Sequence, residues 1–271
     1  MPTEDQREGL WARLVMLGNP TKGRKEAPRL ALERQPERVY AIGDVHGCLD
    51  LLTELEAKIM EDAADEPDET LIVMLGDLID RGPQSAQVIE HLIAEPPDRF
   101  KRICLRGNHE AMMLEFIARP GRNTIWLENG GRETLQSYGV PIEVLAPGVA
   151  PTVLARVVAR AVTPAHVQFL SRLPVLLETP QTIFVHAGLR PGRALKRQSD
   201  LDLIWMRDNY NNTYEEFART VVHGHMPRSE ALVSSFRIGI DTGACSSGRL
   251  TAVRILPGFA PKLLSVSRDG L

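Results

Sequence analysis

The sequence predicts an α/β fold for most of this 271-residue chain. Three apolar segments each end in Gly-Asp or Gly-Asn, and after each of them apolar residues recur at helical spacing. This alternation is typical of parallel strands joined by helical crossovers. The segment Leu71–Leu75 (LIVML) is apolar without interruption, as expected for a strand in a sheet that is covered on both faces.

The expected elements follow one another from residue 38. We predict strands at 38–44, 69–77 and 99–108, and helices at 49–63, 85–95 and 109–118. Residues 120–180 are richer in helical patterns. Turn residues separate the later apolar segments and no long helix follows the third, so we expect antiparallel pairing in a second sheet or second half. These later segments are 182–188, 220–225, 235–241 and 249–256.

Residues 1–36 differ from the rest of the chain. After the short apolar segment Leu10–Leu17 they are polar, contain proline and show no clear period. We therefore predict a poorly ordered or surface-strapped N-terminal extension at 1–36 and a compact domain at 37–271.

The composition limits the partners. The net charge is −3 with acids and bases mixed, so we expect no nucleic acid partner. No apolar run approaches the roughly 18–20 residues of a membrane span, and we expect neither a membrane nor a secretory signal. The three cysteines, Cys48, Cys104 and Cys245, form no CxxC pair. We expect them to be reduced thiols in a cytoplasmic protein, and no redox role is assigned to Cys48.

Residue types that commonly bind metal ions follow the ends of the three core strands and of two later ones. In parallel α/β sheets ligands bind beyond the carboxyl ends of the strands, and a series of such polar loops is hard to explain as solvated turns. The residues are Asp44 and His46 (GDVHG), Asp77, Asp80 and Arg81 (GDLIDRG), Asn108 and His109 (RGNHE), His186 (VHAG), and either His223 or His225 (VHGH).

The types of ligand predict the type of metal. Imidazole, carboxylate and amide oxygen together suit Mn²⁺, Fe or Zn²⁺ better than Ca²⁺, which prefers oxygen alone. The ligands are too many for one tetrahedral ion, whereas two ions about 3.5–4 Å apart that share a carboxylate would use them all. Such a site holds a water between the ions and aims it at phosphorus for in-line displacement.

The motifs GDVHG, GDLIDRG, RGNHE, HAG and GH, in this order from Gly43 to His225, resemble the metallophosphoesterase superfamily. More narrowly they resemble the bacterial and phage type of the serine/threonine phosphoprotein phosphatase family, because IDTGACSSGRL at 240–250 replaces the C-terminal segment of eukaryotic members. The resemblance implies a metallophosphoesterase-like β-sandwich with a βαβαβ core flanked by helices. It also makes 37–271 the catalytic domain.

The resemblance also implies a role for each matching residue. Asp44 and His46 would hold one divalent ion, Asp77 would bridge both, and Asn108, His186 and His225 would hold the second. Mn²⁺ is the expected metal, with Fe or Zn²⁺ as alternatives. His109 would be the general acid, oriented by Asp80. The phosphate oxygens would be clamped by Arg81, Arg106 and Arg207.

Some neighbouring residues are given lesser roles. Glu110 is expected to be a first-turn acid or a partner of the ligands and not a proton carrier. Trp126–Gly131 (WLENGG) also resembles bacterial members, and its role is left open between structure and substrate contact. His91 and His166 are expected to be plain surface residues.

The implied activity is that of a serine/threonine protein phosphatase acting on a phosphorylated protein or peptide, with no regulatory partner identified. The alternative is a symmetrical dinucleoside polyphosphate hydrolase, for example one that cleaves diadenosine tetraphosphate, because such enzymes share the metal residues and the IDTG segment. Glu110 in RGNHE and the stretch Trp205–Arg207 favour phosphoprotein. The 5% aromatic content argues against a base-stacking pocket. A binding protein with a dead site is disfavoured, because no ligand is missing.

Overall fold

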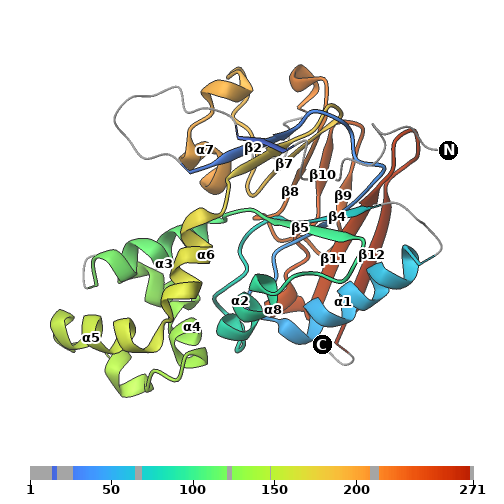
Figure 1. The fold of residues 1–271 in the computed structure, drawn as a ribbon. Coiled ribbons are helices and arrows are strands. Elements are labelled where there is room, and N and C mark those ends of the chain that lie inside the picture. The colour runs from blue at the N-terminus through green and yellow to red at the C-terminus, as the bar shows by residue number, and fades with distance from the viewer. Residues whose placement is uncertain are drawn as a thin grey trace.

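The computed structural model describes residues 14–16, 27–64, 69–120, 124–146, 148–207 and 214–268. Two sheets face each other (Figure 1). The five-stranded sheet has the order β12-β11-β3-β4-β5, and the seven-stranded sheet has the order β1-β2-β6-β7-β8-β10-β9. The expected β-sandwich with a βαβαβ core is confirmed.

The strands are short. They are β1 (Leu14–Met16), β2 (Arg29–Leu32), β3 (Arg38–Ile42), β4 (Thr70–Met74), β5 (Phe100–Cys104), β6 (Leu176–Glu178), β7 (Thr182–Val185), β8 (Thr220–His223), β9 (Leu232–Val233), β10 (Arg237–Gly239), β11 (Arg249–Ile255) and β12 (Lys262–Ser267).

Helices connect and cover the sheets. They are α1 (Leu49–Asp62), α2 (Ser85–Ile93), α3 (Asn108–Ala118), α4 (Arg132–Ser137), α5 (Pro151–Ala161), α6 (Pro164–Arg172), α7 (Asp200–Trp205) and α8 (Ala244–Ser247). A π-helical turn at Leu127–Gly131 precedes α4, and short 3₁₀ turns lie at Ile142–Leu145, Leu195–Arg197 and Glu215–Phe217.

Three buried clusters form the layers. Between the sheets, side chains such as Val73 of β4 and Phe184 of β7 pack together. On the outer face of the five-stranded sheet, Ile42 and Met74 lie under the helices from α1 to α6. The outer face of the seven-stranded sheet is covered by residues of α7, among them Leu203. Alternate residues of each strand thus serve opposite faces.

The later strands do not pair as the sequence predicts. β7 and β8 are parallel, as are β8 and β10, and β11 joins the five-stranded sheet antiparallel to β3. Parallel neighbours need a connection of about a dozen residues or more. The chain between β7 and β8, which contains α7, and the chain between β8 and β10 are both long enough.

The predicted boundary at residue 36 is also wrong for part of the extension. β2 pairs parallel with β6, and its Leu30 and Leu32 are buried in the layer between the sheets. These residues belong to the sandwich because they pair with β6. The segment is too short for its own pattern to predict a strand. Most of the predicted extension, 1–13 and 17–26, lies outside the described residues.

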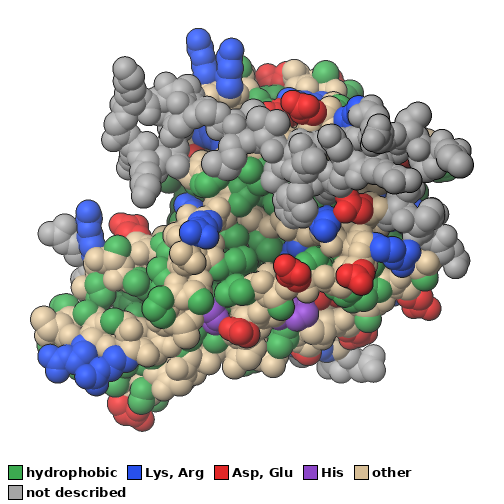
Figure 2. Space-filling model, in the orientation of Figure 1, with side chains coloured by type: hydrophobic (Ala, Val, Ile, Leu, Met, Phe, Trp, Pro, Cys, Tyr) green, Lys and Arg blue, Asp and Glu red, His purple; other side chains and the backbone are tan. Residues whose placement is uncertain are grey.

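Charged side chains of both signs are interspersed over the described part of the face in Figure 2. An apolar hollow of about 510 Å³ lies between α2, β5 and α6, lined by residues such as Ile93, Ile103 and Phe169. Within the described residues, none of the helices is long and apolar enough to span a membrane.

Candidate metal centre

The predicted ligands meet at one edge of the sandwich. Asp44, Asp77 and Asn108 follow β3, β4 and β5, while His186 and His225 follow β7 and β8. Each of these strands ends at the same side of its sheet, since β3, β4 and β5 are parallel to one another and β7 is parallel to β8. The site therefore lies where the carboxyl ends of both sheets converge.

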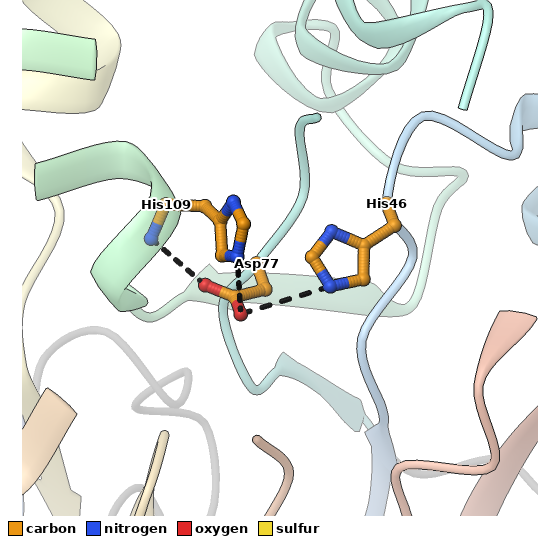
Figure 3. A group of neighbouring side chains, drawn as sticks. All are labelled: His46, Asp77 and His109. Atoms are coloured by element: carbon orange, nitrogen blue, oxygen red, sulfur yellow. Dashed lines mark hydrogen bonds and ion pairs between the residues drawn. The ribbon is translucent and has the colours of Figure 1, made fainter. Parts of the chain in front are cut away.

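Asp77 is at the centre of the site. Its Oδ2 lies 3.3 Å from Nε2 of His186 and 3.8 Å from Nε2 of both His46 and His109. Figure 3 shows His46 and His109 on either side of this carboxylate. Two groups of metal-ligand atoms share Asp77, one with His46 and His109 and the other with His186 and His225. A shared carboxylate between two ligand groups is the arrangement of a two-metal site.

The second group fits a cation for a chemical reason. Nε2 of His186 lies 2.9 Å from Oδ1 of Asn108 and 3.2 Å from Nδ1 of His225, in addition to its approach to Asp77. Nδ1 of His186 can donate to the carbonyl of Leu75 at 2.9 Å, which leaves the lone pair of Nε2 free. Four electron-pair donors then converge on one point, where a divalent ion would satisfy them together.

The first group is prepared in the same way. Nδ1 of His46 lies 2.8 Å from the carbonyl of Ile79, so Nε2 faces Asp77. Burial lowers the pKa of both His46 and His225 to about 3. Both imidazoles are therefore neutral, which is the form that binds metal.

The charge balance also favours a cation. Burial alone would raise the pKa of Asp77, but His186, His109 and His46 hold it well below its ordinary value. Burial would lower the pKa of His186, but the charge of Asp77 outweighs it and raises that pKa. A buried carboxylate that draws protons onto its neighbours is a place where metal ions bind favourably.

Asp44 lies beside this cluster with a partner that the sequence reasoning missed. Its carboxylate accepts hydrogen bonds from the backbone N–H of His225 at 3.0 and 3.2 Å and interacts with the buried side chain of Asp241. Burial, Asp241 and Asp77 raise the pKa of Asp44 well above its ordinary value. Asp241 is the first residue of the DTG motif, for which the sequence alone predicts no role.

His109 forms a pair with Asp80. Nδ1 of His109 lies 2.6 Å from Oδ2 of Asp80, whereas Nε2, at the other side of the ring, lies 3.2 Å from Nη2 of Arg81 and 3.8 Å from Oδ2 of Asp77. Asp80 is fully buried and accepts further hydrogen bonds from Nε1 of Trp126 at 2.8 Å and Oγ1 of Thr134 at 2.6 Å. Burial would lower the pKa of His109, but Asp77 and Asp80 raise it. This imidazole is therefore able to hold a proton near neutral pH.

Trp126 has a positioning role. Its Nε1 donates to Asp80, and its ring is held in place because it is buried against Phe116.

Glu110 lies in the first turn of α3, where its carboxylate accepts four backbone hydrogen bonds at 2.7–3.4 Å. The donors are the N–H groups of Gly107, Asp77, Leu78 and Ile79. Burial and the charge of Asp77 raise the pKa of Glu110 to about 7, against the effect of these donors.

Two of the three predicted phosphate-binding arginines line the site. Nη1 of Arg81 lies 2.8 Å from Nε2 of His46 and Nη2 lies 3.2 Å from Nε2 of His109. Arg81 and the exposed Arg207 line a cavity of about 370 Å³ together with Asp77, Asn108, His109, Met112, Asn129, Trp205, His225, Met226 and Pro227.

Arg106 does not reach this cavity. Its guanidinium donates to the carbonyls of Leu170 and Ser171 at the end of α6, at 3.3 and 2.6 Å. This direction does not support the predicted clamp role, because the side chain points to α6 and ties that helix to the core. The sequence shows Arg106 beside the ligands but not the direction of its side chain.

Three histidines outside the ligand set have structural partners. Nε2 of His223 accepts a hydrogen bond from Nε of Arg237 at 3.0 Å, and His223 belongs to neither group of metal-ligand atoms. His166 is buried and bonded to Tyr138 and Glu90, and His91 pairs with Glu56. The expectation of a plain surface residue is therefore wrong for His166, whereas His91 is partly exposed and paired.

Residues 37–247 match the model of the calcineurin-like phosphoesterase family. The chain belongs to this family. It is a metallophosphoesterase, a hydrolase with phosphatase activity whose family binds two divalent metal ions. The expected family is thereby confirmed.

Relatives of this metallophosphoesterase carry different names. It is 30% identical over 228 residues to the serine/threonine-protein phosphatase 1 of Salmonella typhimurium, covering 80% of this chain and 91% of that protein. It is 26% identical to the asymmetrical bis(5'-nucleosyl)-tetraphosphatase PrpE of Bacillus thuringiensis, covering 79% and 88%. The structure of a putative diadenosine tetraphosphatase has a TM-score of 0.60, with 22% identity over 89% of this chain and 98% of that chain. The last likeness shows the fold alone.

Proposed function

We propose that this metallophosphoesterase hydrolyses phosphoserine and phosphothreonine in proteins or peptides. The observation that supports this substrate class is the Asp80–His109 pair, in which His109 lines the cavity and its Nε2 lies 3.8 Å from Oδ2 of Asp77. A serine or threonine alkoxide is a poor leaving group that needs a proton. A nucleotide phosphate leaves as a stable anion and needs that proton less.

The proposed division of the metal ligands follows the family resemblance, and Asp77 is shared as it is in the two ligand groups, while His109 of the first group is kept as the general acid. Asp44, His46 and Asp77 would hold one ion, and Asp77, Asn108, His186 and His225 would hold the other. Mixed imidazole and carboxylate ligands suit Mn²⁺, with Fe or Zn²⁺ as alternatives. When bound, the two ions supply positive charge to the phosphate and activate a water molecule for in-line attack.

The protein residues perform the remaining steps. Arg81 and Arg207 bind phosphate oxygens with forked donors and stabilise the charge of the transition state. Asp80 fixes the ring of His109 through Nδ1, so that Nε2 points at the leaving oxygen. His109 then donates the proton from Nε2 as the ester bond breaks.

One observation favours a second candidate, a dinucleoside polyphosphate hydrolase. Trp205, which is 39% exposed, lines the cavity with Met226 and Pro227. Indole is a surface on which a nucleobase stacks. The low aromatic content therefore argues less strongly against a nucleotide than the composition suggested. Diadenosine tetraphosphate is the substrate to test, and symmetrical cleavage is the form expected from the sequence.

The deciding experiment compares kcat/KM for a phosphothreonine peptide and for diadenosine tetraphosphate, with purified protein and added Mn²⁺. Fast peptide turnover with an inert dinucleotide supports the proposal. Fast dinucleotide cleavage with a slow peptide reaction overturns it in favour of the second candidate. The products then show which bond is cleaved. Symmetrical cleavage gives two equal nucleotides, whereas asymmetrical cleavage gives a nucleoside triphosphate and a nucleoside monophosphate.

A further inference from the structure

The turn Leu127–Gly131 contributes one polar side chain to the site cavity. Asn129 is exposed and lines the cavity of about 370 Å³ together with Arg81 and His109. A carboxamide neither gains nor loses a proton near neutral pH, so at this cavity Asn129 can act only through hydrogen bonds. Its role is therefore either to support the site or to bind the substrate.

Gly130 fixes this turn against the loop that carries Asp80 and Arg81. The carbonyl of Gly130 accepts a hydrogen bond from the backbone N–H of Arg81 at 3.3 Å. A Cβ on Gly130 would lie 2.5 Å from that nitrogen and 3.0 Å from Cβ of Asp80, and its φ of 107° disfavours a side chain as well. Asp80 in turn is bonded to His109. The turn therefore lies on the side of the cavity where the general acid meets the leaving group.

The side chain of Asn129 is oriented within its own turn. Its Nδ2 donates a hydrogen bond to the carbonyl of Ile125 at 2.7 Å, which fixes the plane of the carboxamide. In the described part of the chain, Oδ1 and the second N–H of Nδ2 have no other hydrogen-bond partner. One acceptor and one donor with a fixed plane are therefore available to a ligand that enters the cavity.

We propose that Asn129 binds a main-chain peptide group beside the phosphorylated residue of the substrate, and so determines the preference for peptides. This inference rests on the proposed phosphoprotein function. A peptide chain offers N–H donors and C=O acceptors, and one carboxamide can pair with both kinds of group. In phosphoserine and phosphothreonine only Cβ and Cα separate the leaving oxygen from the peptide groups, so a residue near His109 can reach them.

Adenine is the other ligand that pairs with asparagine, through its N6 and N7. In a dinucleoside polyphosphate, however, the ribose and further phosphates separate the base from the bond that is cleaved. A residue on the leaving-group side of a small cavity is therefore better placed for a peptide group than for adenine. The experiment must still separate these two ligands.

The expected effect is weaker substrate binding without a loss of chemistry. Asn129→Ala removes one or two hydrogen bonds to the substrate, and each contributes a factor of about 2–12 in affinity. Bonds that are equally strong in the ground state and the transition state affect KM and leave kcat unchanged. We therefore expect the KM of N-acetyl-phosphothreonine methylamide to rise by about 5- to 50-fold. The KM of nitrophenyl phosphate, which has no peptide group, should change much less.

The test measures kcat and KM with added Mn²⁺ for this capped phosphothreonine, for nitrophenyl phosphate and for diadenosine tetraphosphate. Glu128→Ala is the matched control, because Glu128 is exposed in the same turn but lines a separate cavity of about 260 Å³. All its constants should equal those of wild type. Ester analogues of the capped phosphothreonine, in which oxygen replaces one peptide N–H at a time, complete a double-mutant cycle. At least one ester should raise KM in wild type and have no further effect in Asn129→Ala.

The outcomes separate this inference from the proposed function. An unchanged KM for the capped phosphothreonine in a folded Asn129→Ala protein would overturn the inference and leave the proposed function in place. A fall in kcat for all substrates with unchanged KM would also overturn it, because Asn129 would then only support Asp80 and Arg81. A rise in KM for diadenosine tetraphosphate alone would assign Asn129 to adenine instead.

Two results on wild-type protein need no variant. Equal KM values for the amide and for both esters would overturn the inference even if Asn129→Ala did not fold. Cleavage of diadenosine tetraphosphate but not of the capped phosphothreonine would overturn the proposed function, and this inference with it.

Discussion

Gly224, between His223 and His225, provides a direct test of the geometry around Asp44. A Cβ on Gly224 would lie 1.9 Å from Oδ1 of Asp44. Real Cβ atoms essentially never come closer than 3.0 Å to another heavy atom. In Gly224→Ala the carboxylate of Asp44 must therefore move away by about 1.1 Å, or the loop must move by the same amount.

This displacement sets the expected magnitude. Asp44 would lose its hydrogen bonds from the backbone N–H of His225 and its alignment with the ligand group. Misplacement by about 1 Å costs on the order of 10²-fold in rate. We expect kcat for an aryl phosphate to fall by about that factor and the Mn²⁺ concentration for half-maximal activity to rise.

The assay measures kcat against Mn²⁺ concentration, metal content by elemental analysis, and thermal unfolding to show that the variant is folded. Gly239→Ala is the matched control, because its Cβ would lie 3.2 Å from the nearest atom, in His223, at a position of ordinary φ. A folded Gly224→Ala protein with wild-type kcat and wild-type metal affinity would refute the reasoning that Asp44 must occupy this position.

Four further variants test other parts of the site and fold. His109→Asn should lower phosphopeptide turnover by about 10²–10⁴, with metals retained and a smaller loss for nitrophenyl phosphate, whose leaving group needs no proton; equal losses would contradict the general-acid role. Asp77→Asn should reduce the occupancy of both ions, and two metals per chain by elemental analysis would disprove the bridge. Arg106→Ala should lower the free energy of unfolding by about 1–3 kcal/mol in urea titration and leave kcat/KM unchanged, since its partners are carbonyls of α6; a large fall in kcat/KM would restore the clamp role. Deleting residues 1–36 removes β2 and should lower the melting temperature and abolish activity; an unchanged melting temperature would show that the sandwich does not need this strand.

The position of the ligands could be predicted from the sequence because it depends on local pattern and sheet topology. Asp44, Asp77 and Asn108 each follow an apolar strand, and parallel strands bring such ends to one edge. His186 and His225 could be added by their motifs, although their strands belong to the other sheet. The approach of His186 to Asp77 then follows from the packing of the two sheets.

The errors concern features that depend on long-range packing. The side chain of Arg106 turns toward α6, which comes much later in the sequence. β2 has a weak pattern of its own and is a strand because β6 lies beside it. Neither the contact of Trp126 with Asp80 nor that of Asp241 with Asp44 leaves a periodic signal in the sequence. A pattern shows which residues end a strand, but not where a long side chain or a distant partner lies.

The backbone at the site explains why Glu110 belongs beside the ligands. Eight described non-glycine residues have positive φ, and five of them are at the site. They are His46, Asp77, Asp80, Arg81 and His225. Such conformations cost about 1–3 kcal/mol each and persist only where the surroundings impose them.

The carboxylate of Glu110 accepts hydrogen bonds from the N–H groups of Asp77, Leu78 and Ile79. These groups lie in the turn that holds three of the five residues. Glu110 therefore stabilises the conformation that aims Asp77 at both ligand groups and Asp80 at His109. This role requires a buried acceptor with two oxygens and no transfer of a proton, which accounts for the glutamate in RGNHE.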